Sequence, residues 1–152
     1  AMQFVRFMPK VKELGFNNVL TADINPEAIK LLKNKGFNVI KNNFFEKINK
    51  KQKFNLIIFN PPYLPEDELE PKDSRTNTTA GKRGYELIIR FLKQTKSHLE
   101  KDGKIILLIS SLSKPEIIKK QAKELGYQMK LLNQTNLFFE ELFVYELTLL
   151  KN

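Results

Sequence analysis

The 152-residue chain contains no cysteine and no tryptophan, and His98 is its only histidine. The lack of cysteine excludes disulfides and zinc sites built from thiolates. A single imidazole supplies neither a histidine metal cage nor a Ser–His–Asp triad. His98 falls at helical spacing in FLKQTKSHLE, so we expect it on a helix surface. No apolar run approaches the ~18 residues of a transmembrane helix, so no membrane span is expected.

The net charge of the chain also bears on which partners it could bind. Lysine and arginine together number 26 against 17 acidic residues, which gives a formal net charge of +9. A basic surface attracts nucleic acid or acidic proteins through its long-range field. The excess is almost entirely lysine and is spread along the chain. Charge alone is therefore a weak indication of nucleic-acid binding.

Strand-like and helix-like segments alternate along a chain whose length suits one domain, residues 1–152, and this order predicts a parallel α/β sheet. An amphipathic helix is expected at the N-terminus, in AMQFVRFMPKVKELGF. The expected strands are 17–25, 37–43, 54–60 and 104–110, followed by an antiparallel hairpin with the polar turn NQTN. The other expected helices are 26–35, 82–101 and a last one that ends at Gly126.

Local signals mark where these elements begin and end. Asn25 is a good N-cap, Pro26 suits the first helical turn, and Gly36 can close that helix in the left-handed region. Ser113-Lys114-Pro115-Glu116 has the form of a capping box, and Asp102-Gly103 has the form of a turn. In helix 82–101, one apolar stripe is expected at Ile88, Phe91, Leu92, Thr95 and Leu99.

The strand FNLIIFN is continuously apolar, which predicts cover on both faces, and it ends in Asn60-Pro61-Pro62-Tyr63. Prolines cannot donate to a sheet ladder, so the strand stops there. The side-chain oxygen of Asn60 and the carbonyl of Pro61 can accept both N–H bonds of a planar amine and localise its lone pair. Tyr63 can stack on the same flat group. The motif therefore predicts methylation of an amide or an exocyclic amine.

Asp23 ends the first expected strand, and ligands of open α/β sheets bind beyond the carboxyl ends of strands. A carboxylate at this place can accept both hydroxyls of a ribose. The alternative is that Asp23 helps to cap the following helix. Asn25 fills that role better, so the sequence favours a ligand contact for Asp23.

The segments ADINPEAI, FNPPYLP, AGKRGYELIIRFL and KIILLIS, in this order, resemble the HemK-type N5-glutamine methyltransferases, especially their archaeal and eukaryotic release-factor branch. The resemblance implies a Rossmann-like class I methyltransferase fold: a doubly wound, mostly parallel sheet with a C-terminal antiparallel hairpin. It also implies S-adenosylmethionine as cofactor, a cytoplasmic enzyme, a peptide-release factor as protein substrate, and a small zinc-binding partner subunit.

The resemblance carries residue roles as well. Asp23 and its neighbour Ile24 would hold the donor's ribose, and Asn43 with Phe44 would lie near the adenine. Family members usually carry an aspartate at the position of Asn43, so a charge is lost there. Asn60 would border the donor and, together with Pro61, Pro62 and Tyr63, would embrace the glutamine amide.

One family feature does not occur in this sequence. A glycine-rich loop of the type G-x-G-x-G normally follows the first strand, and none of the six glycines forms one. The chain is therefore expected to be the larger C-terminal part of a methyltransferase, with a first strand absent between the strands that end at Asp23 and Asn60. Such a gap would expose unpaired backbone on two neighbouring strands.

Two further functions use the same residues. An RNA or DNA base-amino methyltransferase, acting on adenine N6 or guanine N2, would share the Asn-Pro-Pro-Tyr chemistry and use the basic surface as a track. A non-catalytic subunit would keep the fold without the donor site, as the missing glycine loop suggests.

Overall fold

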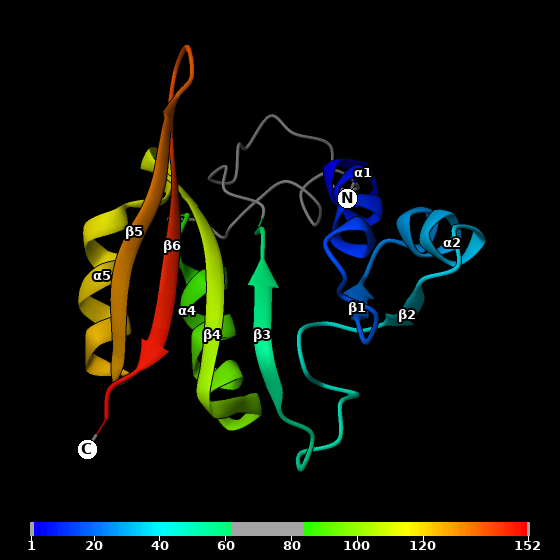
Figure 1. Cartoon of the computed structure of the whole chain (residues 1–152). Helices are drawn as coiled ribbons and strands as arrows, with labels where there is room; N and C mark the ends of the chain where they lie inside the picture. The colour runs from blue at the N-terminus through cyan, green and yellow to red at the C-terminus, as the bar shows by residue number, and fades with distance from the viewer. Residues whose placement is uncertain (1, 62–83, 152) are drawn as a thin grey trace. The chain divides into compact units, whose positions relative to one another are not determined.

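A computed structural model describes residues 2–61 and 84–151, with side chains described from Met8 onward within those ranges. The chain divides into two units, Ala1–Ile48 and Asn49–Asn152. Each unit has its own sheet and its own helices, and each is described by itself (Figure 1). Of the site predictions, those on Pro62 and Tyr63 lie outside the described residues.

The first unit is a two-stranded parallel sheet with two helices. Its elements are α1 (Met2–Glu13), β1 (Leu20–Asp23), α2 (Pro26–Asn34) and β2 (Asn38–Lys41). One apolar core joins both helices to β2, and its buried residues are Met8, Val11, Ala28, Ile29, Leu32 and Val39. The expected helix–strand–helix–strand order is confirmed, with strands shorter than predicted.

The predicted ends of α2 are confirmed in atomic detail. The Oδ1 atom of Asn25 accepts hydrogen bonds from the backbone amides of Glu27, at 2.9 Å, and Ala28, at 3.3 Å. Pro26 occupies the first helical turn, where its missing N–H costs no helical hydrogen bond. Gly36 follows the helix at φ 76°, a left-handed conformation that favours glycine.

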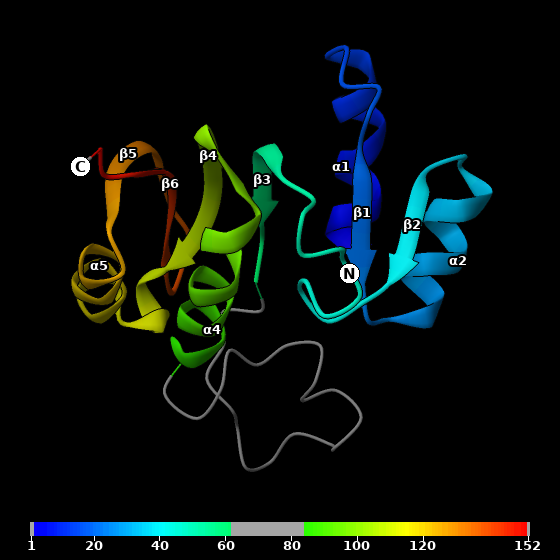
Figure 2. The same ribbon diagram turned by 90° about the horizontal axis from the view of Figure 1, so that it is seen from below.

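The second unit is a four-stranded mixed sheet in the order β3-β4-β6-β5. β3 and β4 run parallel, while β6 pairs antiparallel with both β4 and β5. Figure 2 shows α4 and α5 against the same face of this sheet. The elements are β3 (Phe54–Phe59), α4 (Glu86–Thr95), the 3-10 turn η1 (Lys96–His98), β4 (Leu99–Ser110), the 3-10 turn η2 (Ser111–Ser113), α5 (Pro115–Glu124), β5 (Tyr127–Asn136) and β6 (Glu141–Leu149).

The core of the second unit lies between that face and the two helices. Ile105, Leu107 and Ile109 alternate along β4 and are fully buried. All five residues of the predicted apolar stripe are buried, but only Ile88, Phe91, Leu92 and Thr95 lie on α4, because Leu99 is the first residue of β4. The stripe is therefore confirmed except at Leu99. The hydroxyl of Tyr127 donates a 2.8 Å hydrogen bond to the carbonyl of Leu92 and so ties β5 to α4. Burial raises the pKa of this phenol well above its usual range.

The predicted turn at Asp102-Gly103 is wrong, and the preceding helix is shorter than expected. α4 ends at Thr95, and β4 runs without a break from Leu99 to Ser110. Between its pairings with Phe54 and Leu56 of β3, β4 advances from Leu99 to Lys104, so the extra residues form an irregularity in the ladder. A Cβ atom at Gly103 would lie 2.9 Å from the carbonyl oxygen of Phe54. Glycine serves a close approach of two strands here, rather than a turn.

Two local predictions near α4 and α5 are also wrong. His98 is only 5% exposed, and its Nδ1 atom lies 2.9 Å from the carbonyl oxygen of Gln52. The predicted capping box does not form: the N-cap of α5 is Lys114 in the left-handed region at φ 53°, without a side-chain cap. Glu116 instead pairs with Lys119 at 2.9 Å, and this hydrogen bond raises the pKa of Lys119.

The C-terminal hairpin is confirmed, but its turn lies further along the chain than predicted. The NQTN segment is the end of β5, where it pairs with β6 through Asn136 and Glu141. The turn instead spans Leu137–Glu140, closed by a 2.8 Å hydrogen bond from the amide of Leu137 to the carbonyl of Glu140.

Among the described residues, β1 pairs only with β2, and β3 pairs only with β4. β3 is therefore an edge strand, and its Ile58 is 39% exposed, so the expected cover on both faces is incomplete. In the described part of the chain no pairing links β1 with β3, and the expected absence of a strand between them stays a prediction. In the part of the chain that the structure describes, no helix combines the length and hydropathy needed for a bilayer span.

Candidate active site

Asn60 and Pro61 directly follow β3, at the carboxyl edge of the parallel pair β3–β4. The side chain of Asn60 is exposed and Pro61 is buried. Just before them, the Phe59 ring stacks on Phe91 of α4, with ring centroids 3.9 Å apart and planes inclined at 24°. This contact anchors the strand end to a buried helix. Asn60 is thus presented to solvent from a fixed point, at the place where ligands of such sheets bind.

Asp23 ends β1, in the corresponding position of the first unit. Its carboxylate is half-buried, and Oδ1 accepts a 2.8 Å hydrogen bond from the backbone amide of Asn25. A carboxylate offers about four acceptor positions on its two oxygens. One bond to a backbone amide fixes the group and leaves acceptor capacity for a diol. Its neighbour Ile24 is 41% exposed, an apolar surface next to this acceptor.

After β2, two adjacent asparagines have different roles. Asn42 is only 4% exposed; its Nδ2 donates to the carbonyl of Phe44 at 3.0 Å, and its Oδ1 accepts the amide of Lys47 at 3.0 Å. Asn42 therefore holds the loop together. Asn43 is half-exposed, and its Nδ2 atom donates a 2.9 Å hydrogen bond to Glu46. The Oδ1 atom of the same amide is an acceptor.

Phe44 adopts φ 53°, a left-handed conformation that is rare for a bulky residue. Such a conformation costs about 1–3 kcal/mol and persists where the surroundings enforce it. Here the hydrogen bond from Asn42 to the carbonyl of Phe44 is one such constraint. Strained backbone of this kind concentrates at ligand sites. The loop after β2 thus has a fixed and unusual shape beside Asn43.

These residues fit the chemistry of an adenosyl donor. A ribose diol needs an acceptor such as the Asp23 carboxylate, an exocyclic adenine amine needs an acceptor such as the Asn43 oxygen, and an adenine ring needs apolar neighbours such as Ile24 or Phe44. The sequence names all four as candidates, and their contact with the donor stays a prediction. The sequence did not identify Asn42, although a second asparagine directly after a strand is a usual signal for a loop-closing side chain.

Comparisons with known proteins agree with this chemistry. The model of the Eco57I restriction-modification methylase family matches residues 10–138. A putative protein N5-glutamine methyltransferase of Methanocaldococcus jannaschii is 38% identical over 136 residues, which cover 86% of this chain and 69% of that protein. A release factor glutamine methyltransferase of Aquifex aeolicus is 34% identical over 101 residues, 57% of this chain but only 36% of that protein.

Solved structures show the same fold. The E. cuniculi Mtq2–Trm112 complex, described as responsible for methylation of the eRF1 translation termination factor, matches with a TM-score of 0.65 at 18% identity, over 97% of this chain and 95% of that one. A ribosomal protein L11 methylase of Lactobacillus delbrueckii matches with a TM-score of 0.62 at 19% identity. That match covers 93% of this chain and 63% of the methylase.

The chain belongs to the methylases that the matching family model describes, and it has the fold of S-adenosylmethionine-dependent class I methyltransferases. Within that class it belongs to the HemK-type family of N5-glutamine methyltransferases, with the archaeal relative as a member that it matches over most of its length. The predicted fold class, enzyme class and methyl donor are therefore confirmed.

Proposed function

We propose that this protein methylates the side-chain amide nitrogen of a glutamine in a peptide-release factor. The observation that carries the proposal is Asn60-Pro61 at the carboxyl end of β3, in a chain 38% identical to a putative N5-glutamine methyltransferase. Other relatives are named release factor glutamine methyltransferases, and they match over 36% or less of their own length.

The residue roles follow from the chemistry of an amide. Its nitrogen is a poor nucleophile because its lone pair is delocalised into the carbonyl. The Asn60 oxygen and the Pro61 carbonyl accept its two N–H bonds, which turns the lone pair out of conjugation. The prolines hold these acceptors in place before the substrate arrives. Pro62 and Tyr63 lie outside the described residues. The roles proposed for them from the sequence are a restricted backbone at Pro62 and stacking of the Tyr63 ring on the amide plane.

The donor is held by the residues of the first unit. Asp23 accepts the ribose hydroxyls, Asn43 accepts the adenine amine, and Ile24 and Phe44 supply apolar contacts. When bound, S-adenosylmethionine supplies the methyl carbon, whose bond to sulfur breaks as its bond to nitrogen forms. The amide nitrogen then loses one proton to water, so no strong base is needed among the protein's residues.

The test is an acceptor screen with radiolabelled S-adenosylmethionine. Purified release factor, total RNA and duplex DNA are offered in parallel, and mass spectrometry locates the methylated residue. We expect label on one glutamine of the release factor, and none after that glutamine is replaced by asparagine. Label on nucleic acid alone would contradict the proposal.

A base-amino methyltransferase is the second candidate. The observation in its favour is the match of residues 10–138 to a restriction-modification methylase family, together with the formal charge of +9. The same Asn60 chemistry would then act on adenine N6 or guanine N2. The acceptor screen separates the two functions directly, and a protein without activity on any acceptor would favour the non-catalytic alternative.

Two predictions about assembly complete the proposal. A further strand pairs with both β1 and β3, each of which has a single strand partner among the described residues. A small partner subunit binds the protein, as in the Mtq2–Trm112 complex. Intact-mass analysis of the purified protein from its native source, combined with calorimetric donor titration, tests both: a second polypeptide is expected, and a lone chain that binds the donor tightly would contradict them.

A further inference from the structure

The turn between β5 and β6 exposes two adjacent phenylalanines. Phe138 is 92% exposed and Phe139 is 86% exposed, while the other exposed large apolar side chains that the structure describes range from 39% to 63%. The two rings contact each other edge to face, with centroids 4.6 Å apart and planes at 82°. With the half-exposed Leu137, they form an apolar surface at the end of the hairpin, here termed the hairpin tip (Leu137–Phe139).

The two phenylalanines of the hairpin tip are not the residue types that hairpin turns prefer. The hydrogen bond from Leu137 to Glu140 leaves Phe138 and Phe139 as the central residues. Two-residue hairpin turns favour Asn-Gly or Gly-X, because both central residues of the first type and the first central residue of the second take positive φ. Neither phenylalanine is among the described residues with positive φ. A residue choice that serves neither the turn nor the core indicates selection for something else, and function is the usual reason.

The hairpin extends beyond the carboxyl ends of β3 and β4, which is the end of the sheet where Asn60 lies. β3 and β4 are parallel, so Asn60 and the end of β4 share an edge, and Ser110 at that end pairs with Leu142 of β6. Figure 1 shows the hairpin extending past the end of β4. Two hydrogen bonds fix its base: Ser110 Oγ donates to Glu140 at 2.5 Å, and the amide of Glu141 donates to Ser111 Oγ at 3.0 Å. The hairpin tip is thus held beyond the edge where the acceptor amide is expected.

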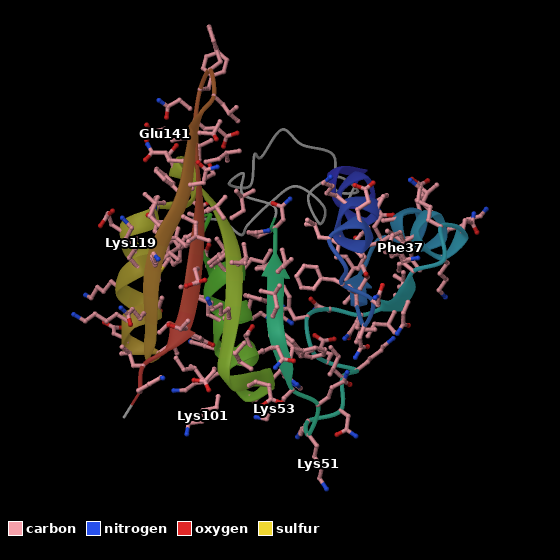
Figure 3. All side chains as sticks on the ribbon, in the orientation of Figure 1. Phe37, Lys51, Lys53, Lys101, Lys119 and Glu141 are labelled. Atoms are coloured by element: carbon pink, nitrogen blue, oxygen red, sulfur yellow. The ribbon has the colours of Figure 1, made fainter. Side chains whose placement is uncertain are left out.

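Charge around the hairpin tip differs from that of the rest of the chain. Residues 131–150 contain no lysine and no arginine, and they contain three glutamates, in a chain with a formal charge of +9. Glu140 and Glu141 directly follow the tip. Figure 3 shows Lys51, Lys53 and Lys101 at the opposite end of the four-stranded sheet from Glu141. An acidic, apolar projection repels phosphate and suits an apolar protein surface bordered by basic side chains.

We propose that the hairpin tip docks the protein acceptor, through an apolar patch on the acceptor that is flanked by lysine or arginine. This inference rests on the proposed function and deepens it, because it assigns recognition of a folded protein to a surface outside the Asn-Pro-Pro-Tyr motif. Exposed aromatic side chains that become buried in a partner are the usual energetic centres of protein interfaces.

The test compares two acceptors and two matched double variants. The acceptors are intact release factor and a short synthetic peptide that carries its acceptor glutamine. The tip variant is Phe138→Ser with Phe139→Ser. The control is Leu14→Ser with Phe16→Ser, which removes two apolar side chains that are 63% and 47% exposed on the first unit.

For the tip variant we expect KM for the intact release factor to rise about 30-fold, which corresponds to the loss of about 2 kcal/mol that is usual for a buried aromatic anchor. Its kcat, and both constants with the peptide, should match the wild-type values, because the peptide is too short to reach the tip. The control should behave as wild type with both acceptors. Thermal unfolding of each variant reports whether the fold is kept.

Reversing the charge of Glu141, at the base of the hairpin, tests the inference independently. Glu141→Lys should raise KM for the release factor, and more so at low ionic strength, where charge contacts are less screened. If the hairpin instead bound nucleic acid, Glu141→Lys would tighten binding to RNA or DNA. That result would overturn the inference.

The inference and the proposed function fail in different ways. Methylation of both acceptors with an unchanged KM in the tip variant would refute docking and keep the function. Methylation of neither acceptor by the wild-type protein, assayed together with any polypeptide that co-purifies with it, would refute the function itself. A tip variant that only converts a dimer into a monomer, or only loses binding to phospholipid vesicles, with KM unchanged, would assign the tip to self-association or to a lipid surface and refute acceptor docking.

Discussion

The backbone amide of Asn25 donates a 2.8 Å hydrogen bond to Oδ1 of Asp23, while the side chain of Asn25 caps α2. The cap of α2 and the orientation of the Asp23 carboxylate therefore depend on different groups of Asn25. The cap depends on the Asn25 side chain, and the orientation of the Asp23 carboxylate depends on a backbone N–H that any residue except proline supplies at that position.

This separation predicts different results for two substitutions. Asp23→Ala should weaken donor binding about 10- to 100-fold, the usual value of hydrogen bonds to a charged group, with little change in stability. Asn25→Ala should lower the free energy of unfolding by about 1 kcal/mol through loss of the cap and leave donor affinity close to wild type. Calorimetric donor titration and urea unfolding measure the two effects. Equal donor affinity in Asp23→Ala and wild type would remove Asp23 from the donor site.

Asn60→Ala should reduce kcat about 10²- to 10³-fold, as does loss of a hydrogen-bonding group that acts on developing charge. Donor affinity should change much less, because the role proposed for Asn60 is activation of the acceptor. Asn34→Ala, an exposed asparagine at the end of α2, is the matched control and should be fully active. Single-turnover methylation with radiolabelled donor measures the loss. Unchanged activity would exclude Asn60 from the mechanism.

Gly103→Ala should destabilise the protein by about 1–3 kcal/mol, the usual cost of overpacking. The added Cβ would lie 2.9 Å from the Phe54 carbonyl and 2.9 Å from Cδ1 of Leu99, and backbone cannot yield as a flexible side chain can. Lys101→Ala, at an exposed position of the same strand, should change stability little. Urea unfolding midpoints of both variants test the close approach of β3 and β4.

Tyr127→Phe should change how stability depends on alkaline pH. Because burial raises the pKa of Tyr127 above its ordinary value of about 10, only the unfolded chain ionises this phenol as the pH passes 10. The free energy of unfolding of the wild type therefore falls above pH 10, by up to about 1.4 kcal/mol per pH unit from this group.

The phenylalanine variant lacks that decline. At pH 7 it should be about 1 kcal/mol less stable than wild type, through loss of the 2.8 Å hydrogen bond to Leu92. The difference should shrink or reverse above pH 10. Urea unfolding at pH 7, 9.5 and 10.5 measures both effects, and parallel pH profiles of the two proteins would contradict burial of the phenol.

The sequence predicted the features that local chemistry decides. Asn25 and Pro26 mark a helix start, and an apolar run followed by two prolines marks the end of β3. Predictions failed where partners distant in sequence decide the outcome. The Asp102-Gly103 pair has local turn chemistry, but pairing with β3 keeps it inside β4. His98 is buried because the carbonyl of Gln52, 46 residues away, accepts its hydrogen bond.

Predictions about the site also depended on whether local sequence or a distant partner decides the structure. Asp23 and Asn43 could be placed at the ends of the parallel strands of the first unit, and Asn60 after β3 of the second unit, because each ends or follows an apolar segment with the pattern of a strand. The apolar hairpin turn could not be predicted, because Leu-Phe-Phe has the composition of a strand and the polar NQTN has the composition of a turn. The pairing of Asn136 with Glu141 overrides both preferences.

The irregularity between Leu131 and Asn133 divides β5 into two parts. The part before it contributes buried Tyr127 to the core, while residues 130–139 are exposed. The outer hairpin therefore adds little to the folding energy and can change in sequence, length or composition while the sheet beneath it stays intact. Such an element is suited to evolutionary exchange and to engineering: transplanting the outer hairpin between relatives is a way to redirect one catalytic framework toward a different acceptor protein.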